Sequence, residues 1–146
     1  MNNIKEILSK YKKIAMVGVS NNPTKASTIV MKYMQKYGFK VYPVNPKAKG
    51  QKILGEEVFE KITDIKDKVD IVNVFRPSKE AFDIAKGAVS IGAKVLWLQL
   101  GIKSKQARKL VEKNNIKYVE DRCTKMEYQK HFLKVRQAFP VLQDQN

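Results

Sequence analysis

Residues 13–38, KIAMVGVSNNPTKASTIVMKYMQKYG, join an apolar run, a turn of small residues and an amphipathic stretch. The apolar run 13–19 is nearly continuous, which is typical of a parallel strand covered on both faces. It stops at the turn around Gly18 and Ser20, and a helix is expected to begin near Thr24. A turn without bulky side chains lets backbone N–H groups approach a phosphate, and the helix N-terminus adds the positive end of its dipole. This order of elements predicts a nucleotide-binding α/β unit.

Strand and helix patterns alternate along the rest of the chain. Further strands are predicted at residues 39–44, 69–75, 94–100 and 116–119, and further helices at 79–91, 105–114 and 125–138. Because such alternation produces right-handed βαβ crossovers, we expect an α/β fold with a doubly wound, mainly parallel five-stranded sheet and helices on both faces.

Details of these elements can also be predicted. Ser78 and Ser104 stand where they would cap two of the helices, and residues 53–65 indicate a short extended piece with a turn of helix. We expect one domain over residues 1–140, followed by a flexible C-terminal tail over residues 141–146.

The charge balance invites a search for anionic partners. The 146 residues include 29 Lys and Arg against 14 Asp and Glu, a formal net charge of +15. Clustered basic side chains bind phosphate backbones by releasing counterions. The lysines, however, are spread over nearly every segment, and neither an RNP-like aromatic motif nor a zinc-finger spacing accompanies them. A basic nucleic-acid-binding module is therefore the least favoured function left open, and the charge suits anionic small ligands.

A single cysteine, Cys123, and a single histidine, His131, limit the chemistry further. They exclude an internal disulfide, a cysteine-based metal cage and a His-rich metal site. No stretch approaches about 18 consecutive apolar residues, and the N-terminal MNNIKEILSKYKK lacks the long apolar core of a secretory signal. We expect a soluble cytoplasmic protein that uses neither a metal nor a membrane.

The loops at the strand ends are the candidate ligand site, because doubly wound sheets bind ligands there. The first loop departs from the dinucleotide fingerprint: Gly18 matches, but Ser20 and Pro23 occupy the other glycine positions. The second strand ends at residues 45–47, Asn-Pro-Lys, where NAD-binding proteins have an acid for the ribose hydroxyls. A lysine there can pair with an additional phosphate, which both NADP and coenzyme A (CoA) carry, so both ligands stay open on these residues alone.

Five blocks of the sequence together resemble one known family. They read VGVSNNPTKAS, VYPVNPKAKGQKILGE, VDIVNVFRPS, AKVLWLQLG and EDRCTKMEY, in this order between about residues 5 and 128. In this combination the chain is similar to the small bacterial CoA-binding proteins, single-domain relatives of the CoA-binding N-terminal domain of succinyl-CoA synthetase α subunits. The resemblance implies a single Rossmann-like domain that binds CoA or an acyl-CoA across its strand ends.

The resemblance also implies which residues touch each part of the ligand. The diphosphate is implied to contact Gly18, Val19 and Ser20, and phosphate at the helix start is implied to contact Lys25 and Ser27. The adenosine and its 3′-phosphate are implied to face Asn45, Pro46 and Lys47. The adenine and pantetheine region is implied to lie at Phe75, Arg76 and Pro77, and the pantetheine arm at Gln99 and Gly101. Lys25 replaces the arginine of many members, which keeps the charge but loses the bidentate geometry.

Cys123 supports two interpretations. It is either a small buried hydrophobic residue at the end of the last strand or, beside Arg122 and near Lys125, a stabilised thiolate. A thiolate in that position could form a mixed disulfide with the thiol of CoA.

Catalysis by this chain alone is not expected. The resemblance implies that the succinyl-CoA synthetase reaction needs a histidine in a second domain and a second subunit, whereas His131 lies in the predicted C-terminal helix. No Ser-His-Asp set or obvious carboxylate pair suggests another reaction. We expect a CoA-binding protein, with an NADP-binding oxidoreductase-type domain as the alternative, and a protein partner that supplies catalysis stays possible.

Overall fold

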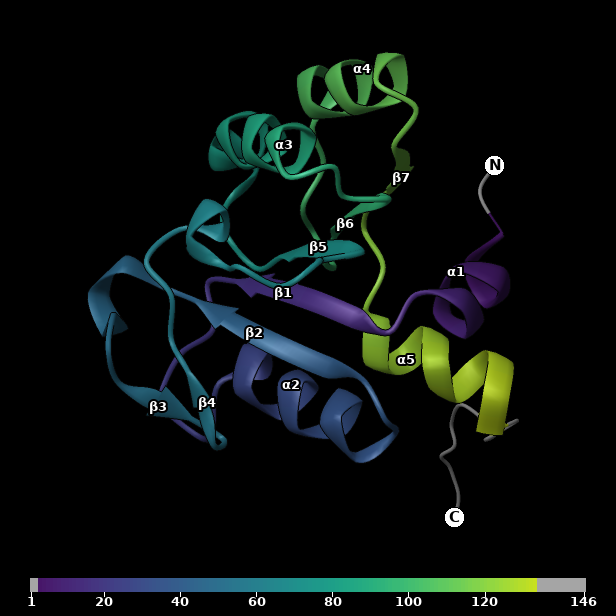
Figure 1. Cartoon of the computed structure of the whole chain (residues 1–146). Helices are drawn as coiled ribbons and strands as arrows, with labels where there is room; N and C mark the ends of the chain where they lie inside the picture. The colour runs from purple at the N-terminus through teal and green to yellow at the C-terminus, as the bar shows by residue number, and fades with distance from the viewer. Residues whose placement is uncertain (1–2, 134–146) are drawn as a thin grey trace.

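All strands of the central sheet run in the same direction (Figure 1). The computed structural model describes residues 3–133, and its five-stranded sheet has the order β2-β1-β5-β6-β7. These strands are β1 (Lys13–Val17), β2 (Lys40–Val44), β5 (Ile71–Val74), β6 (Val95–Leu98) and β7 (Lys117–Val119). The chain moves from β1 out to β2 and then returns past β1 to β5, so the strand order reverses between β1 and β5. Open parallel sheets bind ligands at such a reversal.

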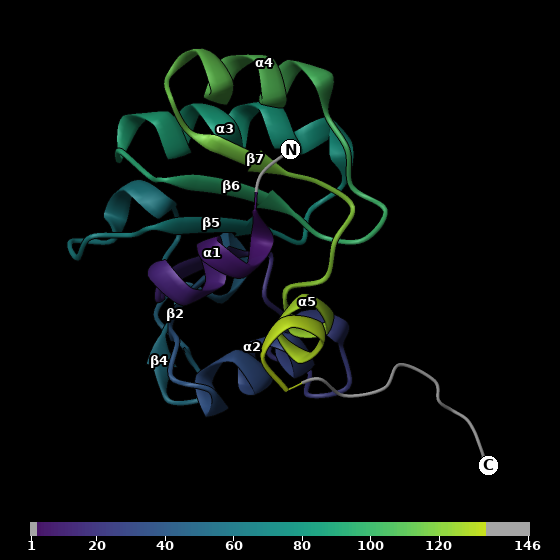
Figure 2. The same ribbon diagram turned by 90° about the vertical axis from the view of Figure 1, so that its right-hand side faces the viewer.

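Helices cover both faces of the sheet, which confirms the predicted fold class (Figure 2). One face carries α1 (Ile4–Lys10), α2 (Ala26–Lys36) and α5 (Thr124–Tyr128), which continues into the π-helical turn η4 (Gln129–Leu133). The other face carries α3 (Ala81–Ser90) and α4 (Lys105–Lys113). Within the described residues, no helix is both long enough and apolar enough to cross a bilayer.

Shorter elements shape the loops around the strand ends. The hairpin of β3 (Lys52–Ile53) and β4 (Glu56–Glu57) leads to the edge of β2, where the N–H of Phe59 donates to the carbonyl oxygen of Pro43 at 2.9 Å. The 3-10 turns are η1 (Pro46–Ala48), η2 (Ile62–Asp64) and η3 (Ser78–Glu80). The extended piece and helical turn predicted within residues 53–65 are thus confirmed.

The apolar runs of the strands are buried on both sides, as their composition predicts. Every residue of β5 and β6 is buried, including Trp97, whose indole Nε1 donates to the carbonyl oxygen of Arg122 at 2.8 Å. Because successive side chains of a strand point to opposite faces, the core divides in two. Ile7, Met31 and Trp97 fill the α1–α2–α5 side, whereas residues such as Leu96 fill the α3–α4 side.

Some predicted strand boundaries and one predicted cap are wrong. β1 ends at Val17 instead of Val19, because Gly18 adopts a φ of +97° and leaves the extended conformation. β5 and β6 are also shorter than the predicted ranges 69–75 and 94–100. Ser78 does not cap α3. Its Oγ accepts a hydrogen bond from the N–H of Lys103 at 3.0 Å, and the 3-10 turn η3 stands before the helix.

Other predictions agree with the structure as far as it is described. Ser104 caps α4, since its Oγ accepts a hydrogen bond from the N–H of Ala107 at 3.1 Å. The C-terminal helix begins at Thr124, one residue before the predicted start. The end of the predicted helix, residues 134–138, and the expected tail, residues 141–146, lie outside the described residues.

A chain of buried polar side chains ties α5 to the middle of the sheet. Asn73 of β5 is fully buried, and its Nδ2 donates to the carbonyl oxygen of Trp97 at 3.2 Å and to Gln99 Oε1 at 3.0 Å. Thr124 gives its N–H to the same Gln99 oxygen at 3.1 Å and its hydroxyl to Asn73 Oδ1 at 3.3 Å. Because a backbone N–H can only donate, these contacts fix which end of each amide carries the oxygen. The network holds the start of α5 in one position on the sheet.

Replacing Thr124 by Val should lower the free energy of unfolding by about 1–3 kcal/mol, because Val keeps the shape but leaves the buried Asn73 Oδ1 without its donor. Urea denaturation followed by circular dichroism measures the change. Thr124→Ser is the matched control, since it keeps the hydroxyl. Equal stability of Thr124→Val and the wild-type protein would contradict the role assigned to this hydroxyl.

Candidate functional site

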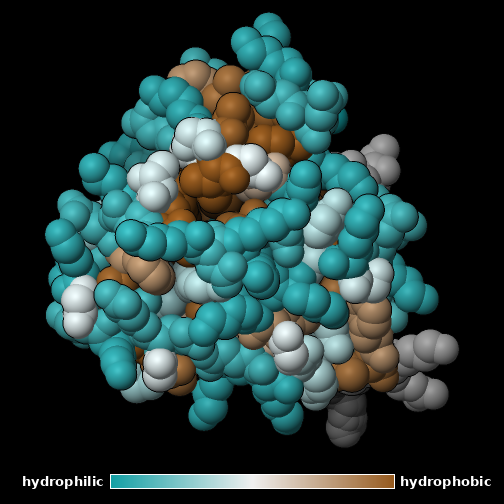
Figure 3. Space-filling view, in the orientation of Figure 1, coloured by the Kyte–Doolittle hydropathy of each residue, from teal (hydrophilic) through white to brown (hydrophobic). Residues whose placement is uncertain are grey.

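A cavity of about 520 Å³ opens where β1, β2 and β5 end, at the reversal of strand order. It lies on the α3 side of the sheet, and Figure 3 shows hydrophobic residues gathered beneath α3 on this face. Its volume is in the range of small-molecule sites. Five residues predicted to bind the ligand line it: Gly18, Asn45, Pro46, Lys47 and Arg76. The loops after the first three parallel strands of the chain therefore meet at one cavity.

Gly18 allows these loops to approach one another. Its φ of +97° lies in the left-handed region, and its N–H donates to the carbonyl oxygen of Val44 at 2.8 Å. A Cβ on this residue would stand 2.8 Å from Cδ of Arg76, closer than real Cβ atoms come to another atom. Glycine is thus required by its backbone conformation and by the side chain packed over it.

The loop after β2 is shaped by Asn45. Its Oδ1 accepts a hydrogen bond from the N–H of Lys47 at 3.0 Å, and its Nδ2 donates to the carbonyl oxygen of Val19 at 2.9 Å. Asn45 therefore joins the loop after β2 to the loop after β1. Lys47 is exposed at the edge of the cavity, where its ammonium can pair with an anionic group.

Arg76 enters the site from the end of β5 and is held by Glu80. The guanidinium donates from Nε to Oε1 at 3.0 Å and from Nη2 to Oε2 at 2.7 Å. These hydrogen bonds hold the pKa of the Glu80 carboxyl below its usual value. With its stem over Gly18 and its head group fixed by a bidentate pair, Arg76 is oriented before any ligand is bound.

The apolar wall of the cavity was missed at the sequence level. Ile84 and Gly87 share a face of α3 and stand opposite Ile62 of η2. A Cβ on Gly87 would lie 2.7 Å from Cδ1 of Ile62, so the glycine allows the turn to pack against the helix. Val17 and Val44 add to the lining from the strand ends. The three-residue spacing of Ile84 and Gly87 is a signal for a shared face, but nothing local indicates that η2 packs there.

Charged residues of both signs surround this apolar lining. They are Lys47, Lys61 and Arg76, and Glu60, Glu80 and Asp83. An interior of this kind suits an uncharged ring system such as a nucleoside, with anionic groups at the basic side of the rim.

The loop between β1 and α2 lies beside the cavity and holds other predicted residues. The N–H of Ser20 donates to Ser27 Oγ at 3.1 Å, so the Ser27 hydroxyl is used inside the loop. Lys25 is exposed and precedes α2 as its N-cap residue, where its side chain makes no capping hydrogen bond because it has no acceptor. The first N–H groups of α2 therefore gain no partner from that side chain, and with the helix dipole they form an anion-binding end.

Three further predicted residues do not line the cavity. Val19 is fully buried on the α1–α2–α5 side, and Phe75 packs against the same part of the core. Pro77 stands just before η3. Their backbones belong to the strand-end loops, whereas their side chains are not at the cavity.

Gln99 and Gly101 lie in the loop after β6. Gln99 is 6% exposed, and its Oε1 accepts the hydrogen bonds from Asn73 and Thr124. Its Nε2 therefore points away from them, and it has no partner among the described residues. Gly101 donates its N–H to Asp121 Oδ1 at 2.7 Å. Gln99 thus offers a fixed, free amide donor at the end of β6.

Cys123 is 8% exposed and packs into the α1–α2–α5 side of the core. It precedes α5 as the N-cap residue, and its carbonyl oxygen accepts a hydrogen bond from the N–H of Glu127 at 2.9 Å. This burial agrees with the interpretation of Cys123 as a small buried hydrophobic residue. Cys123 is nevertheless next to Thr124, whose N–H contacts Gln99, so its backbone lies close to the loop after β6.

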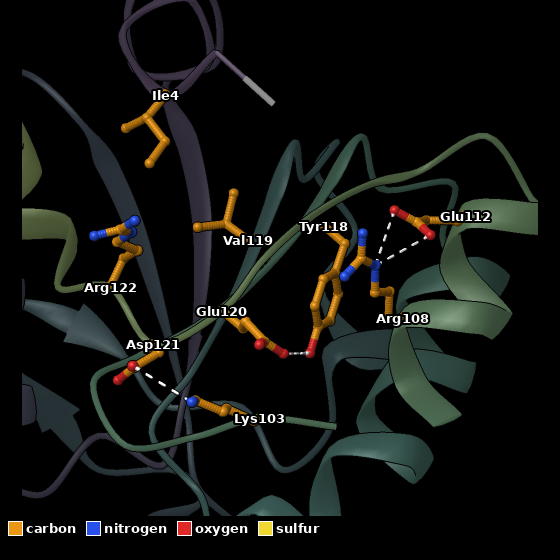
Figure 4. A pocket seen from close by; sticks show the side chains of 9 residues that line it. All are labelled: Ile4, Lys103, Arg108, Glu112, Tyr118, Val119, Glu120, Asp121 and Arg122. Carbon is orange, nitrogen blue, oxygen red and sulfur yellow. Dashed lines mark hydrogen bonds and ion pairs between the residues drawn. The ribbon is translucent and has the colours of Figure 1, made fainter. Parts of the chain in front are cut away.

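A second hollow, of about 490 Å³, lies at the β7 edge of the sheet, and none of the predicted cofactor-binding residues lines it (Figure 4). Most of its charged groups are bonded to a neighbour, and Arg122 is the exception among those drawn. Arg108 Nε lies 3.3 Å from Glu112 Oε1, and the Tyr118 hydroxyl donates to Glu120 Oε1 at 2.7 Å. The cavity between β1, β2 and β5 is therefore the better candidate for an anionic nucleotide.

Comparisons with known proteins show the family to which the chain is similar. Residues 12–129 match the CoA binding domain family. The uncharacterised protein YneT of Bacillus subtilis is 35% identical over 123 residues, which cover 84% of this chain and 90% of that protein. The structure of a hypothetical protein from Pyrococcus horikoshii superposes with a TM-score of 0.84 at 38% identity, and the match covers 87% of this chain and 88% of that one.

A larger relative is also similar over part of its length. The α subunit of the ADP-forming acetate–CoA ligase I of Pyrococcus furiosus is 32% identical over 95 residues, which are 62% of this chain and 21% of that subunit. The match to the family spans all five strands of the parallel sheet and the loops at its carboxyl edge. The chain therefore belongs to the CoA binding domain family, as the sequence resemblance indicated.

Proposed function

We propose that this protein binds CoA or an acyl-CoA across the carboxyl ends of β1, β2, β5 and β6. The observation that carries the proposal is the 520 Å³ cavity at the reversal of strand order, where Gly18, Asn45, Lys47 and Arg76 meet. Membership of the CoA binding domain family supports CoA over NADP. The absence of an acid directly after β2, where Lys47 stands instead, argues against NAD.

The proposed ligand runs along the strand ends. The adenosine occupies the apolar cavity beside Ile84, with its 3′-phosphate at Lys47, and the diphosphate crosses the turn at Gly18 toward the start of α2, where Lys25 is exposed. Neighbouring strands are about 4.8 Å apart, so the three steps from β2 to β6 span about 14 Å. This path brings the pantetheine arm to the free amide donor of Gln99, which can bond a carbonyl oxygen of that arm.

We further propose a binding role without a reaction of the chain's own. The ligase subunit from Pyrococcus furiosus matches this chain over 21% of its length, so its reaction belongs to a much larger protein. Within residues 3–133, no group of three or more His, Cys, Asp or Glu side chains is placed to hold a metal ion. A carrier, a sensor or a subunit that delivers CoA to a catalytic partner fits these features.

Adding CoA should raise the melting temperature, because a ligand that binds the folded state stabilises it. At about one hundred times the dissociation constant the gain is about 2.7 kcal/mol, which corresponds to roughly 5–10 °C for a domain of this size. Differential scanning fluorimetry with CoA, acetyl-CoA and NADPH makes the measurement. Native mass spectrometry of freshly purified protein tests for a co-purified ligand. A melting temperature unchanged by millimolar CoA would argue strongly against the proposal.

Replacing Lys47 by Gln should weaken CoA binding about five- to tenfold and leave dephospho-CoA binding unchanged, because dephospho-CoA lacks the 3′-phosphate assigned to this ammonium. Isothermal titration calorimetry with both ligands on both proteins measures the difference. Lys66→Gln is the matched control, since Lys66 is exposed outside the cavity. Equal losses for the two ligands would place the 3′-phosphate elsewhere.

We also propose that Cys123 meets the sulfur end of the bound ligand. The thiol would attack CoA disulfide, form a mixed disulfide with one CoA and release the other as CoA thiol. Because Cys123 is buried, with 8% of the residue exposed, reaction should require a reagent that the strand-end site holds in place.

Incubation with CoA disulfide should therefore add one CoA to Cys123, whereas glutathione disulfide should react much more slowly. Intact-protein mass spectrometry under non-reducing conditions detects both adducts, and Cys123→Ser is the control. The thiol contact would be excluded if CoA disulfide gave no adduct, or if glutathione disulfide reacted equally fast.

A further inference from the structure

Lysines without a carboxylate partner lie on both sides of the sheet. On the α3–α4 side, Glu80 pairs with Arg76, Asp83 with Lys86 and Glu112 with Arg108. The three lysines of α4, which are Lys105, Lys109 and Lys113, have no such partner among the described residues. The α1–α2–α5 side also carries unpaired lysines. Among the described residues, no carboxylate pairs with Lys32, Lys36, Lys125 or Lys130, which are the lysines of α2, α5 and η4. What distinguishes the unpaired lysines of α2, α5 and η4 from those of α4 is the cluster of aromatic rings beside them.

Helix α2 presents its charge as a row. It contains no acidic residue, and Lys25, Ile29, Lys32 and Lys36 follow one another at intervals of four, three and four residues on one exposed stripe. At 1.5 Å per residue, the row from Lys25 to Lys36 is about 16 Å long. Its opposite side is apolar and already buried against the sheet. The helix thus offers solvent a line of ammonium groups.

Aromatic rings join this row to α5. Tyr33 and Tyr37 of α2 have ring centroids 4.8 Å apart, and Tyr37 lies 5.1 Å from Tyr128 of α5. Tyr128 in turn stacks with Phe132 at 4.8 Å. Tyr33, Tyr37, Tyr128 and Phe132 are all partly exposed. The rings form one continuous cluster between the two helices.

Lysine ammonium groups stand over the same cluster. Lys36 Nζ lies 5.5 Å from the centre of the Tyr37 ring, and Lys125 Nζ lies 5.4 Å from that of Tyr33. The acid of α5, Glu127, is 9% exposed, and its Oε1 is 3.4 Å from Nε2 of His131. It therefore contributes little negative charge to the surface.

We infer that this lysine and aromatic face of α2, α5 and η4 binds a single-stranded nucleic acid. A row of lysines matches a chain of phosphates, and partly exposed rings beside it can stack on bases without reading their sequence. An anionic membrane would instead need an exposed apolar helix face, and that of α2 is buried in the core. Apart from Lys25, which the proposed CoA path also reaches, the face is separate from the cavity, which lies on the α3 side of the sheet.

The test compares two triple variants with the same change in net charge. Lys32→Glu, Lys36→Glu and Lys130→Glu reverse the charge of the proposed face. Lys105→Glu, Lys109→Glu and Lys113→Glu do the same on α4, and all six lysines are exposed, so both proteins should fold. Circular dichroism and the melting temperature check the fold. The probe is a fluorescein-labelled single-stranded RNA of 20 mixed nucleotides, followed by fluorescence anisotropy from 50 to 300 mM KCl.

For the wild-type protein, the logarithm of the association constant should fall with the logarithm of the salt concentration with a slope of about −3, as expected for about four phosphates on a single strand. The α2–η4 variant should bind at least about 30-fold more weakly with a shallower slope, and the α4 variant within about threefold of wild type. Equal losses in both variants would show a response to net charge alone and overturn the proposal. So would anionic vesicles or polyglutamate bound as tightly as the RNA. CoA binding is measured separately, so either function can fail without the other.

Discussion

The packing of Gly18 beneath Arg76 is the contact on which the candidate site depends. A left-handed glycine ends β1 early, and its N–H bonds to the carbonyl oxygen of Val44 at the end of β2. The stem of Arg76, arriving from β5, fills the space that a Cβ would take, while Glu80 fixes its guanidinium. One residue without a side chain therefore brings the ends of three strands to the same cavity. A larger residue at position 18 would separate the strand ends, because its Cβ would meet the side chain of Arg76 and because it would rarely adopt this positive φ.

Much of the fold could be predicted because its signals are local. Nearly continuous apolar runs specify strands covered on both faces, and Gly18, Asn45 and Lys47 stand where those runs stop. The predicted boundaries failed where a neighbour in space decided the outcome. Ser78 looks like a helix cap in sequence, but its hydroxyl bonds to the N–H of Lys103 from a loop 25 residues later. The local sequence pattern cannot show that the fold brings the N–H of Lys103 to this hydroxyl, in place of an N–H of the helix.

The site was only partly predictable for the same reason. The sequence places Gln99 among the strand-end residues, but strand alternation turns its side chain away from the cavity, where Asn73 and Thr124 fix it. The apolar wall of the cavity comes from Ile62, which lies in a 3-10 turn without sequence periodicity, and from Gly87 of α3. The contact between these two residues depends on the tertiary structure. In the proposed binding mode, the ligand consequently uses both faces of the sheet, with the apolar cavity on one side and the amide donor of Gln99 on the other.

The placement of charge gives the two proposed activities a common physical basis. Around the cavity, Glu60, Glu80 and Asp83 match the three basic side chains in number, so its rim is close to balanced. The unpaired lysines of α2, α4 and α5 add to a long-range field that attracts polyanions, including CoA, toward the protein. Salt should therefore slow the association of CoA with the protein, while the short-range contacts of bound CoA change less. Binding of a nucleic acid to the lysine and aromatic face should instead weaken at equilibrium, because counterions compete for the same charges. The difference follows from where each ligand lies: one is partly enclosed between loops, and the other remains on a surface open to salt.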